Sequence, residues 1–248
     1  MRGIILKDNK RYDYTESYLK EHGHEFHDKI APIEDIEFIV FPFMREVDCA
    51  VYNDTFFKAL KPNSIIFSGV RNAYLAEMCK RYNLRYYAMA IAKSVQIKNA
   101  TPTSEGVIAH LITHRIDTIL GSRILVIGYG NCGSDLAKKL RRLGAHVSAL
   151  VRNKDKEDAA HSDNVQPIYL DTLIDALDYD VIINTVPERI FTNEMVDRTD
   201  ALIIDISSKP YGFEDGIATI LPSIPGKYAV RSAGFILGEY IETILRGK

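Results

Sequence analysis

Residues 123–140 read RILVIGYGNCGSDLAKKL, and they carry the most specific fold pattern in the chain. Its first part, Arg123–Ile127, is a short apolar run typical of a parallel strand covered on both faces. Its last part begins a helical pattern that extends over Ser134–Leu143. Between them lies a turn with three glycines. A strand, a glycine-rich turn and a helix in this order predict the start of a βαβ unit.

The three glycines follow the spacing Gly-x-Gly-x-x-Gly, which is typical of a dinucleotide site. We expect Gly128 to permit the tight turn, Gly130 to let the backbone approach a pyrophosphate, and Gly133 to let helix and strand pack closely. The helix N-terminus would offer free N–H groups to the phosphates. A glycine-rich turn can also bind nothing, but here the strand and the helix both match the fingerprint, so we predict an NAD(P) site.

The end of the next strand predicts which cofactor is preferred. An acid there would bind the ribose 2′-hydroxyl of NAD, but His146–Val151 is followed by Arg152-Asn153-Lys154. Because arginine is a planar cation suited to phosphate, we expect NADP(H) to be preferred. If Arg152 is merely solvated, NAD(H) is used. The predicted cofactor contacts come from the turn, this strand end and two later loops: Gly128, Tyr129, Gly130, Asn131, Cys132, Gly133, Arg152, Asn153, Thr185, Val186, Pro187 and Ser207.

Short apolar runs alternate with amphipathic stretches along the whole chain, and this pattern predicts an α/β fold. We expect two doubly wound, Rossmann-like domains joined by a bridging helix. The strands expected in the first half are Gly3–Leu6, Phe38–Phe41, Ser64–Phe67 and Arg85–Ala88. Those expected in the second half are Arg123–Ile127, His146–Val151, Val181–Asn184, Leu202–Ile206 and Thr219–Leu221.

The domain boundary is predicted near residue 100. Residues 93–100 look irregular or extended, and Thr101-Pro102-Thr103-Ser104-Glu105 has the features of a helix start. We expect a flavodoxin- or Rossmann-like, substrate-side domain at residues 1–100, a bridging helix at 101–120 and an NAD(P)-binding domain at 121–248. The last includes a C-terminal helix, Ser232–Leu245, which should pack against a domain through an apolar face: Ala233, Ile236, Leu237, Ile241 and Ile244.

Composition excludes several classes of protein. The net charge is −2, from 31 basic and 33 acidic residues, so no basic surface is expected for nucleic acid or an anionic membrane. No apolar run approaches the roughly 20 residues that span a bilayer. The N-terminus turns polar after one short strand, unlike a signal peptide, and the three cysteines suit a reducing cytoplasm. His22, His24 and His27 surround Gly23 at a helix–strand turn; a solvated turn is favoured there, and no metal site is predicted.

Several segments make the chain similar to the dipicolinate synthase A chain, an oxidoreductase family of endospore-forming bacteria. The most specific are Pro102–Gly106, Gly128–Gly133 with Leu143-Gly144-Ala145, Asn184–Pro187, Asp205–Pro210, and Leu221–Lys227 leading to Ser232-Ala233-Gly234. The resemblance implies oxidation of a cyclic dihydro- or hydroxytetrahydro-dipicolinate from the lysine pathway to dipicolinate. It also implies that the partner is a small flavoprotein-like second subunit, and that the protein works in the mother cell of a sporulating bacterium.

The chain departs from this family in ways that bear on its substrate. It is shorter, chiefly in the N-terminal domain, Lys93 stands in a segment that is usually acidic, and the stretch after Lys209-Pro210 is abbreviated. Two other functions therefore stay open. One is a dehydrogenase or reductase of another small carboxylate; the other is a non-catalytic, nucleotide-sensing Rossmann protein.

A planar dicarboxylate substrate needs cations, N–H donors and a proton acceptor. Loops beyond the carboxyl ends of parallel strands are the expected position for them. Catalytic roles are predicted for Lys209, Lys227 and Glu105, and substrate contacts for Arg71, Thr103, Ser104 and Arg231. The alternatives are that both lysines are solvated after turns and that Glu105 only complements a helix dipole. A homo-oligomer, most simply a dimer, is the expected assembly.

Overall fold

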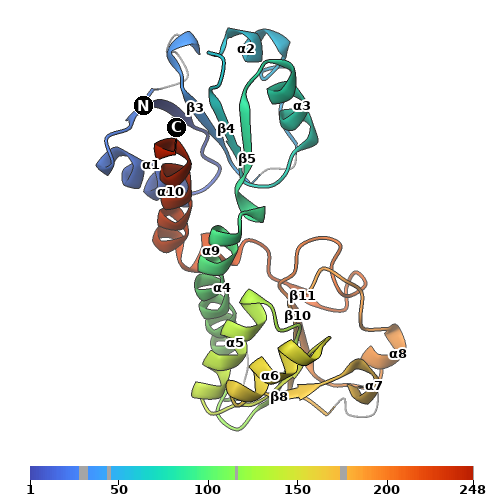
Figure 1. Ribbon diagram of the computed structural model, residues 1–248. Coiled ribbons are helices and arrows are strands. Elements are labelled where there is room, and N and C mark those ends of the chain that lie inside the picture. Colours follow the sequence, from blue (N-terminus) through green and yellow to red (C-terminus); the bar gives the residue numbers. More distant parts are fainter. Residues whose placement is uncertain (28–32, 44–45, 115–116, 174–177, 248) are drawn as a thin grey trace. The chain divides into compact units, whose positions relative to one another are not determined.

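The computed structural model describes residues 1–27, 33–43, 46–114, 117–173 and 178–247. It divides into two compact units, one of Met1–Lys98 with Val230–Lys248 and one of Asn99–Ala229. Each unit has its own parallel sheet and its own hydrophobic core (Figure 1). The predicted class, two doubly wound α/β units with a helix that runs from one into the other, is confirmed.

The first unit has a five-stranded parallel sheet in the order β2-β1-β3-β4-β5. This order is that of flavodoxin-like folds. Strands β3 and β4 are buried along their whole length, which explains why their sequences are continuously apolar. The strands are β1 Arg2–Ile5, β2 Glu25–Phe26, β3 Phe38–Phe41, β4 Ile65–Ser68 and β5 Arg85–Ala88; the helices are α1 Arg11–Glu21, α2 Asp54–Ala59 and α3 Ala73–Arg81, with 3-10 turns η1 Ile33–Asp35 and η2 Met89–Ile91.

The second unit has a six-stranded parallel sheet in the order β11-β10-β9-β6-β7-β8. Counted within the unit, this is the 6-5-4-1-2-3 order of a dinucleotide-binding Rossmann fold, with its switch point between β6 and β9. The strands are β6 Arg123–Ile127, β7 His146–Leu150, β8 Gln166–Ile168, β9 Val181–Asn184, β10 Leu202–Asp205 and β11 Thr219–Ile220; the helices are α5 Asn131–Arg142, α6 Lys154–Ser162, α7 Leu170–Leu173, α8 Asn193–Val196 and α9 Ile224–Tyr228. Strands β2 and β8 were missed because they are very short, and β8 contains Pro167.

Helix α4 spans Lys93–His114, so the predicted bridging helix at 101–120 is wrong at both ends. Pro102 lies inside the helix instead of in its first turn. A proline there removes one backbone donor, but Val95, near the start of the helix, is buried in the core of the first unit. Tertiary packing of the first turns therefore overrides the local signal for a helix start.

The C-terminal helix α10, Val230–Arg246, packs on α1 in the first unit, and its expected place in the NAD(P)-binding domain is wrong (Figure 1). The predicted apolar face is the one that packs, since Leu237 and Ile241 are buried. Two glycines of α10 explain why this helix packs on α1. A Cβ at Gly234 would lie 2.3 Å from the Arg11 carbonyl oxygen, and one at Gly238 would lie 2.7 Å from Tyr18 Cδ1.

Helix α10 also anchors the turn before β2. His24 Nε2 lies 2.5 Å from Glu242 Oε2, and both side chains are almost completely buried. The expected solvated turn is therefore wrong for His24, which pairs with a carboxylate from a distant part of the chain. Within the residues described, no helix is long and apolar enough to cross a membrane.

Candidate functional site

The glycine turn between β6 and α5 has the geometry predicted for it. Gly128 has φ +92°, which other residues rarely adopt, and a Cβ there would lie 2.6 Å from Val186 Cγ1. A Cβ at Gly133 would lie 2.1 Å from the Gly128 carbonyl oxygen. At Gly130 nothing lies within 4 Å of an added Cβ, so the backbone there borders open space. Two glycines thus allow close packing, and the third leaves room for a ligand.

The N-terminus of α5 faces the same place. Its N-cap is Gly130, which has no side chain to accept hydrogen bonds from the first turn. By helix geometry the first N–H groups have no acceptor inside the helix, and they carry a partial positive charge. Burial raises the pKa of the Cys132 thiol, although a hydrogen bond with Thr103 opposes the rise, so Cys132 is a small neutral residue at this turn. The turn and the helix end together suit an anionic pyrophosphate.

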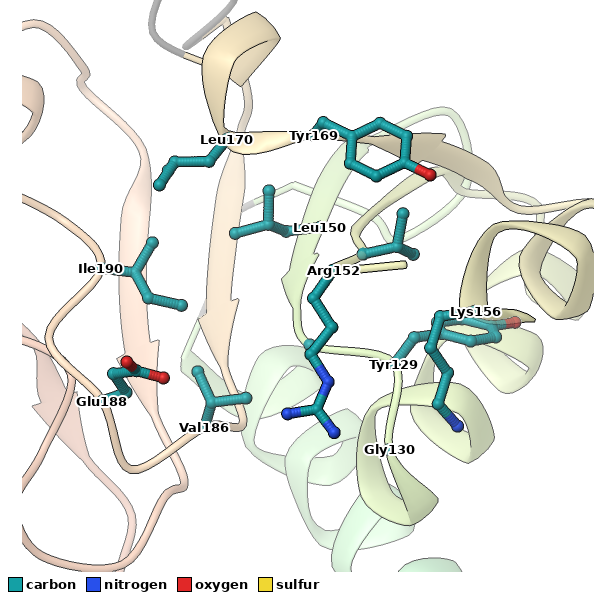
Figure 2. A pocket seen from close by; sticks show the side chains of 12 residues that line it. Tyr129, Gly130, Leu150, Arg152, Lys156, Tyr169, Leu170, Val186, Glu188 and Ile190 are labelled. Atoms are coloured by element: carbon teal, nitrogen blue, oxygen red, sulfur yellow. The ribbon is translucent and has the colours of Figure 1, made fainter. Parts of the chain in front are cut away.

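A cavity of about 520 Å³ opens beside this turn. One wall is apolar, which suits the adenine end of a dinucleotide, and the opposite part holds two cations (Figure 2). The lining residues come from β6–α5, the end of β7, α6, the segment after β8 and the loop after β9: Gly128, Tyr129, Gly130, Leu150, Val151, Arg152, Lys156, Tyr169, Leu170, Val186, Glu188 and Ile190.

Two of these side chains, Arg152 and Lys156, supply positive charge to the cavity. In Figure 2 the Arg152 guanidinium lies between the loop that carries Val186 and the helix that carries Lys156. Neither cation forms an ion pair with any residue described in the structure, whereas neighbouring Lys154 pairs with Glu157 at 3.2 Å and with Asp158 at 3.3 Å. Free cations in a cavity are available for an anionic ligand.

Sequence reasoning missed Lys156, although its signal was present. It lies in the first turn of α6, just after the strand end that carries Arg152, and it lines the same cavity. Tyr169 and Leu170 were missed because they follow β8, which was not recognised as a strand. Asn153 was predicted to contact the cofactor, but its side chain caps α6. Its oxygen accepts a hydrogen bond of 3.1 Å from the Lys156 N–H.

A buried polar network shapes the loops after β9 and β10. Asp205 is fully buried, and its carboxylate accepts hydrogen bonds from Asn184 Nδ2 at 3.0 Å, Gly212 N at 2.7 Å and Ser207 N at 2.7 Å. Thr185 Oγ1 donates to the Ile127 carbonyl at 2.8 Å. Thr185 and Val186 are thus held beside the glycine turn, whereas Ser207 is held by Asp205 on the loop after β10 and does not line the cavity.

Two predicted substrate contacts lie in a helix–helix interface instead. Ser104 is completely buried, and its hydroxyl donates to Asp135 on α5. Thr103 is also buried, with its hydroxyl donating to the Asn99 carbonyl at 2.6 Å. Lys139 completes the contact, 2.5 Å from Asp135 and 3.9 Å from Glu105. Ser104 therefore joins α4 to α5, and its prediction as a substrate ligand is not supported by this position.

The predicted catalytic residues of the second unit are exposed. Glu105 lies on α4, Lys209 follows β10 with its Nζ 5.8 Å from the Tyr211 ring, and Lys227 lies on α9. Lys227 lies within this short helix, which begins at Ile224 with Pro225 in its first turn, where proline is favoured. The longer helix α10 begins directly after it, at Val230.

The remaining two predicted substrate contacts belong to the first unit. Arg71 follows β4 and is exposed. Arg231 is exposed near the start of α10, where its guanidinium lies 5.1 Å from the Phe235 ring. Of the predicted cofactor contacts, five line the cavity: Gly128, Tyr129, Gly130, Arg152 and Val186. The others, Pro187 among them, are not among its lining residues, and the predicted substrate residues are distributed over both units.

Part of the chain, most of it in the second unit, matches a known family. Residues 87–201 match the family described as D-isomer specific 2-hydroxyacid dehydrogenase, NAD binding domain. This match supports a nicotinamide dinucleotide as the ligand of the cavity. The matched segment includes the glycine turn Gly128–Gly133.

Comparisons that cover more of the chain find similarity to the dipicolinate synthase A chain. Over 191 residues the chain is 31% identical to the dipicolinate synthase A chain of Bacillus subtilis (strain 168), covering 73% of this chain and 64% of that one. The aligned part thus spans less than two thirds of the relative. The fold is shared with the crystal structure of dipicolinate synthase A chain from Bacillus subtilis, with a TM-score of 0.89, 23% identity and coverage of 100% and 96%. It is also shared with the crystal structure of the same dipicolinate synthase chain from Bacillus halodurans, with a TM-score of 0.90, 23% identity and coverage of 98% and 97%.

Proposed function

Since this chain is a relative of the dipicolinate synthase A chain, we propose that it is an NADP(H)-dependent dehydrogenase that forms dipicolinate. Its substrate would be a cyclic dihydro- or hydroxytetrahydro-dipicolinate. The observation that carries the proposal is the cavity beside Gly128–Gly133, which combines a free helix N-terminus with Arg152 and Lys156. A flavoprotein-like second subunit, a homo-oligomer and a place in the mother-cell cytoplasm belong to the same proposal.

The oxidation transfers two electrons from the ring. A dihydro ring loses one hydride and one proton and becomes aromatic, while a hydroxytetrahydro ring also loses water. The bound nicotinamide would accept the hydride. The protein then has to hold the carboxylates and accept a proton. Lys227 is proposed for one carboxylate, Lys209 for a carboxylate or a proton relay, and Glu105 for the proton; all three are exposed.

The preference for NADP(H) can be tested on two side chains. We expect Arg152→Ala and Lys156→Ala each to weaken NADPH binding about tenfold while NADH binding changes little, since each removes a cation from the 2′-phosphate. The measurement is a fluorescence titration of both cofactors. Lys154→Ala is the matched control, because Lys154 is a neighbouring lysine that pairs with Glu157 and does not line the cavity. Equal affinity of the parent protein for NADPH and NADH would contradict the preference.

The reaction can be tested with an enzymatically generated cyclic dicarboxylate of the lysine pathway. We expect NADP⁺-dependent growth of NADPH absorbance, together with formation of dipicolinate, when the chain is incubated with this substrate, in the presence and in the absence of the flavoprotein-like second subunit. Turnover of another small carboxylate alone would favour the broader dehydrogenase hypothesis, which the match to a 2-hydroxyacid dehydrogenase domain also supports. NADPH binding without any turnover would instead indicate a nucleotide sensor.

A further inference from the structure

Arg11 is a buried cation in the first unit. It is the first residue of α1, and only 6% of its surface is exposed. Its guanidinium carbon lies 4.7 Å from the centre of the Phe43 ring, so an aromatic face stacks on the cation. Phe43 itself is half-buried, which places the guanidinium just beneath the surface of the unit. A long charged side chain is rarely buried to this extent unless it has a partner.

The hydrogen bonds of Arg11 leave one edge of its guanidinium unused. Nε donates to Asn9 Oδ1 at 3.0 Å, and Asn9 Nδ2 donates to Asp8 Oδ1 at 2.7 Å. This chain of contacts orients the guanidinium plane. Among the residues that the structure describes, no carboxylate forms an ion pair with Arg11 and no acceptor is bonded to Nη1 or Nη2. Burial lowers the pKa of Arg11, and Tyr12 and Asp8 oppose this, yet a guanidinium stays charged in proteins.

Arg11 lies after the carboxyl end of β1, a position where parallel sheets commonly bind ligands. In the order β2-β1-β3-β4-β5, the direction of winding reverses between β1 and β3, and ligands of such sheets lie beyond the carboxyl ends of the strands at this point. Arg11 follows β1, and Phe43 follows β3. Gly69, directly after β4, lets the chain at Phe43 come close, since a Cβ there would lie 2.5 Å from Phe43 Cα.

We propose that Arg11 is the anchor of a carboxylate-binding subsite in the first unit, with Nη1 and Nη2 donating to the two oxygens of one carboxylate. Planar guanidinium and carboxylate groups match in this two-point geometry. An incoming carboxylate would also neutralise the buried charge, whose isolation is costly. The inference deepens the proposed function, on which its choice of a pyridine dicarboxylate rests, but the geometry that supports it lies entirely within this unit.

The test uses the full chain and dipicolinate as the probe, with binding measured by calorimetry. We expect Arg11→Gln to weaken dipicolinate binding at least about tenfold and Arg11→Lys to fall between the parent and Arg11→Gln, because lysine keeps the charge but loses the fork. NADPH binding should not change in either variant. The matched control is Arg81→Gln, an exposed arginine at the end of α3 in the same unit, which pairs with Asp54 and Glu77 and should bind dipicolinate as the parent does.

A second measurement on the parent protein keeps the inference testable if Arg11→Gln does not fold. Dipicolinate should raise the unfolding temperature, and pyridine-2,6-dicarboxamide, which has the same shape without charge, should not. No binding of dipicolinate by the parent, unchanged binding by Arg11→Gln, or equal stabilisation by the diamide would overturn the subsite. If only the proposed function is wrong, dipicolinate still binds through Arg11, but no NADPH is formed in the activity assay.

Discussion

Replacing Gly133 with alanine is expected to abolish dinucleotide binding and to destabilise the second unit. The added Cβ would lie 2.1 Å from the Gly128 carbonyl oxygen, which is a backbone atom and cannot rotate away. Helix α5 would have to move off β6, and forced packing of this kind costs about 3 kcal/mol. Because the pyrophosphate site is made by the same turn, we expect NADPH affinity to fall at least about 100-fold. Thermal unfolding and fluorescence titration measure the two effects.

Gly130→Ala is the matched control for this prediction. Nothing lies within 4 Å of a Cβ at Gly130, and its φ of −85° suits any residue, so stability should be that of the parent. NADPH affinity should still fall, since the methyl group would enter the space where the backbone meets the pyrophosphate. A Gly133→Ala variant with the unfolding temperature and NADPH affinity of the parent protein, or a Gly130→Ala variant less stable than Gly133→Ala, would contradict these roles of the two glycines.

Asp205→Asn is expected to have the second largest effect, although the two side chains have nearly the same shape. The buried carboxylate accepts hydrogen bonds from Asn184, Ser207 and Gly212, all of which donate through N–H groups. An amide would place its own NH₂ against one of these donors. Leaving a buried donor unsatisfied and losing a charged acceptor should together cost about 3 kcal/mol of unfolding free energy.

The same variant should also affect the cavity. Asn184 directly precedes Thr185-Val186, and Asn184 Nδ2 donates both to Asp205 and to the Val186 carbonyl, at 2.8 Å. Loss of the network would loosen the loop that carries Val186, so NADPH affinity should fall about tenfold. Asp200→Asn, which changes an exposed carboxylate before β10, is the control and should behave as the parent protein. Equal unfolding temperatures for the two variants would show that Asp205 does not hold these loops.

Much of the second unit can be predicted from the sequence alone. The apolar runs that became β6, β7, β9 and β10 are covered on both faces, so each strand carries its own signal of burial. The glycine turn is equally local, because the positive φ of Gly128 and the close contact of Gly133 arise within one strand–turn–helix unit. Local interactions of this kind leave a pattern over consecutive residues, and such a pattern can be recognised without the fold.

The features that join distant segments depend on tertiary packing and could not be predicted from local patterns. Helix α10 belongs to the first unit because Gly234 and Gly238 fit against α1, more than 200 residues earlier in the chain. Ser104 becomes part of a helix interface through Asp135, and Arg11 becomes a buried cation through Phe43. In each case the sequence shows an ordinary glycine, serine or arginine. Burial and partner are set by residues far away in the chain, and a local pattern contains no information about them.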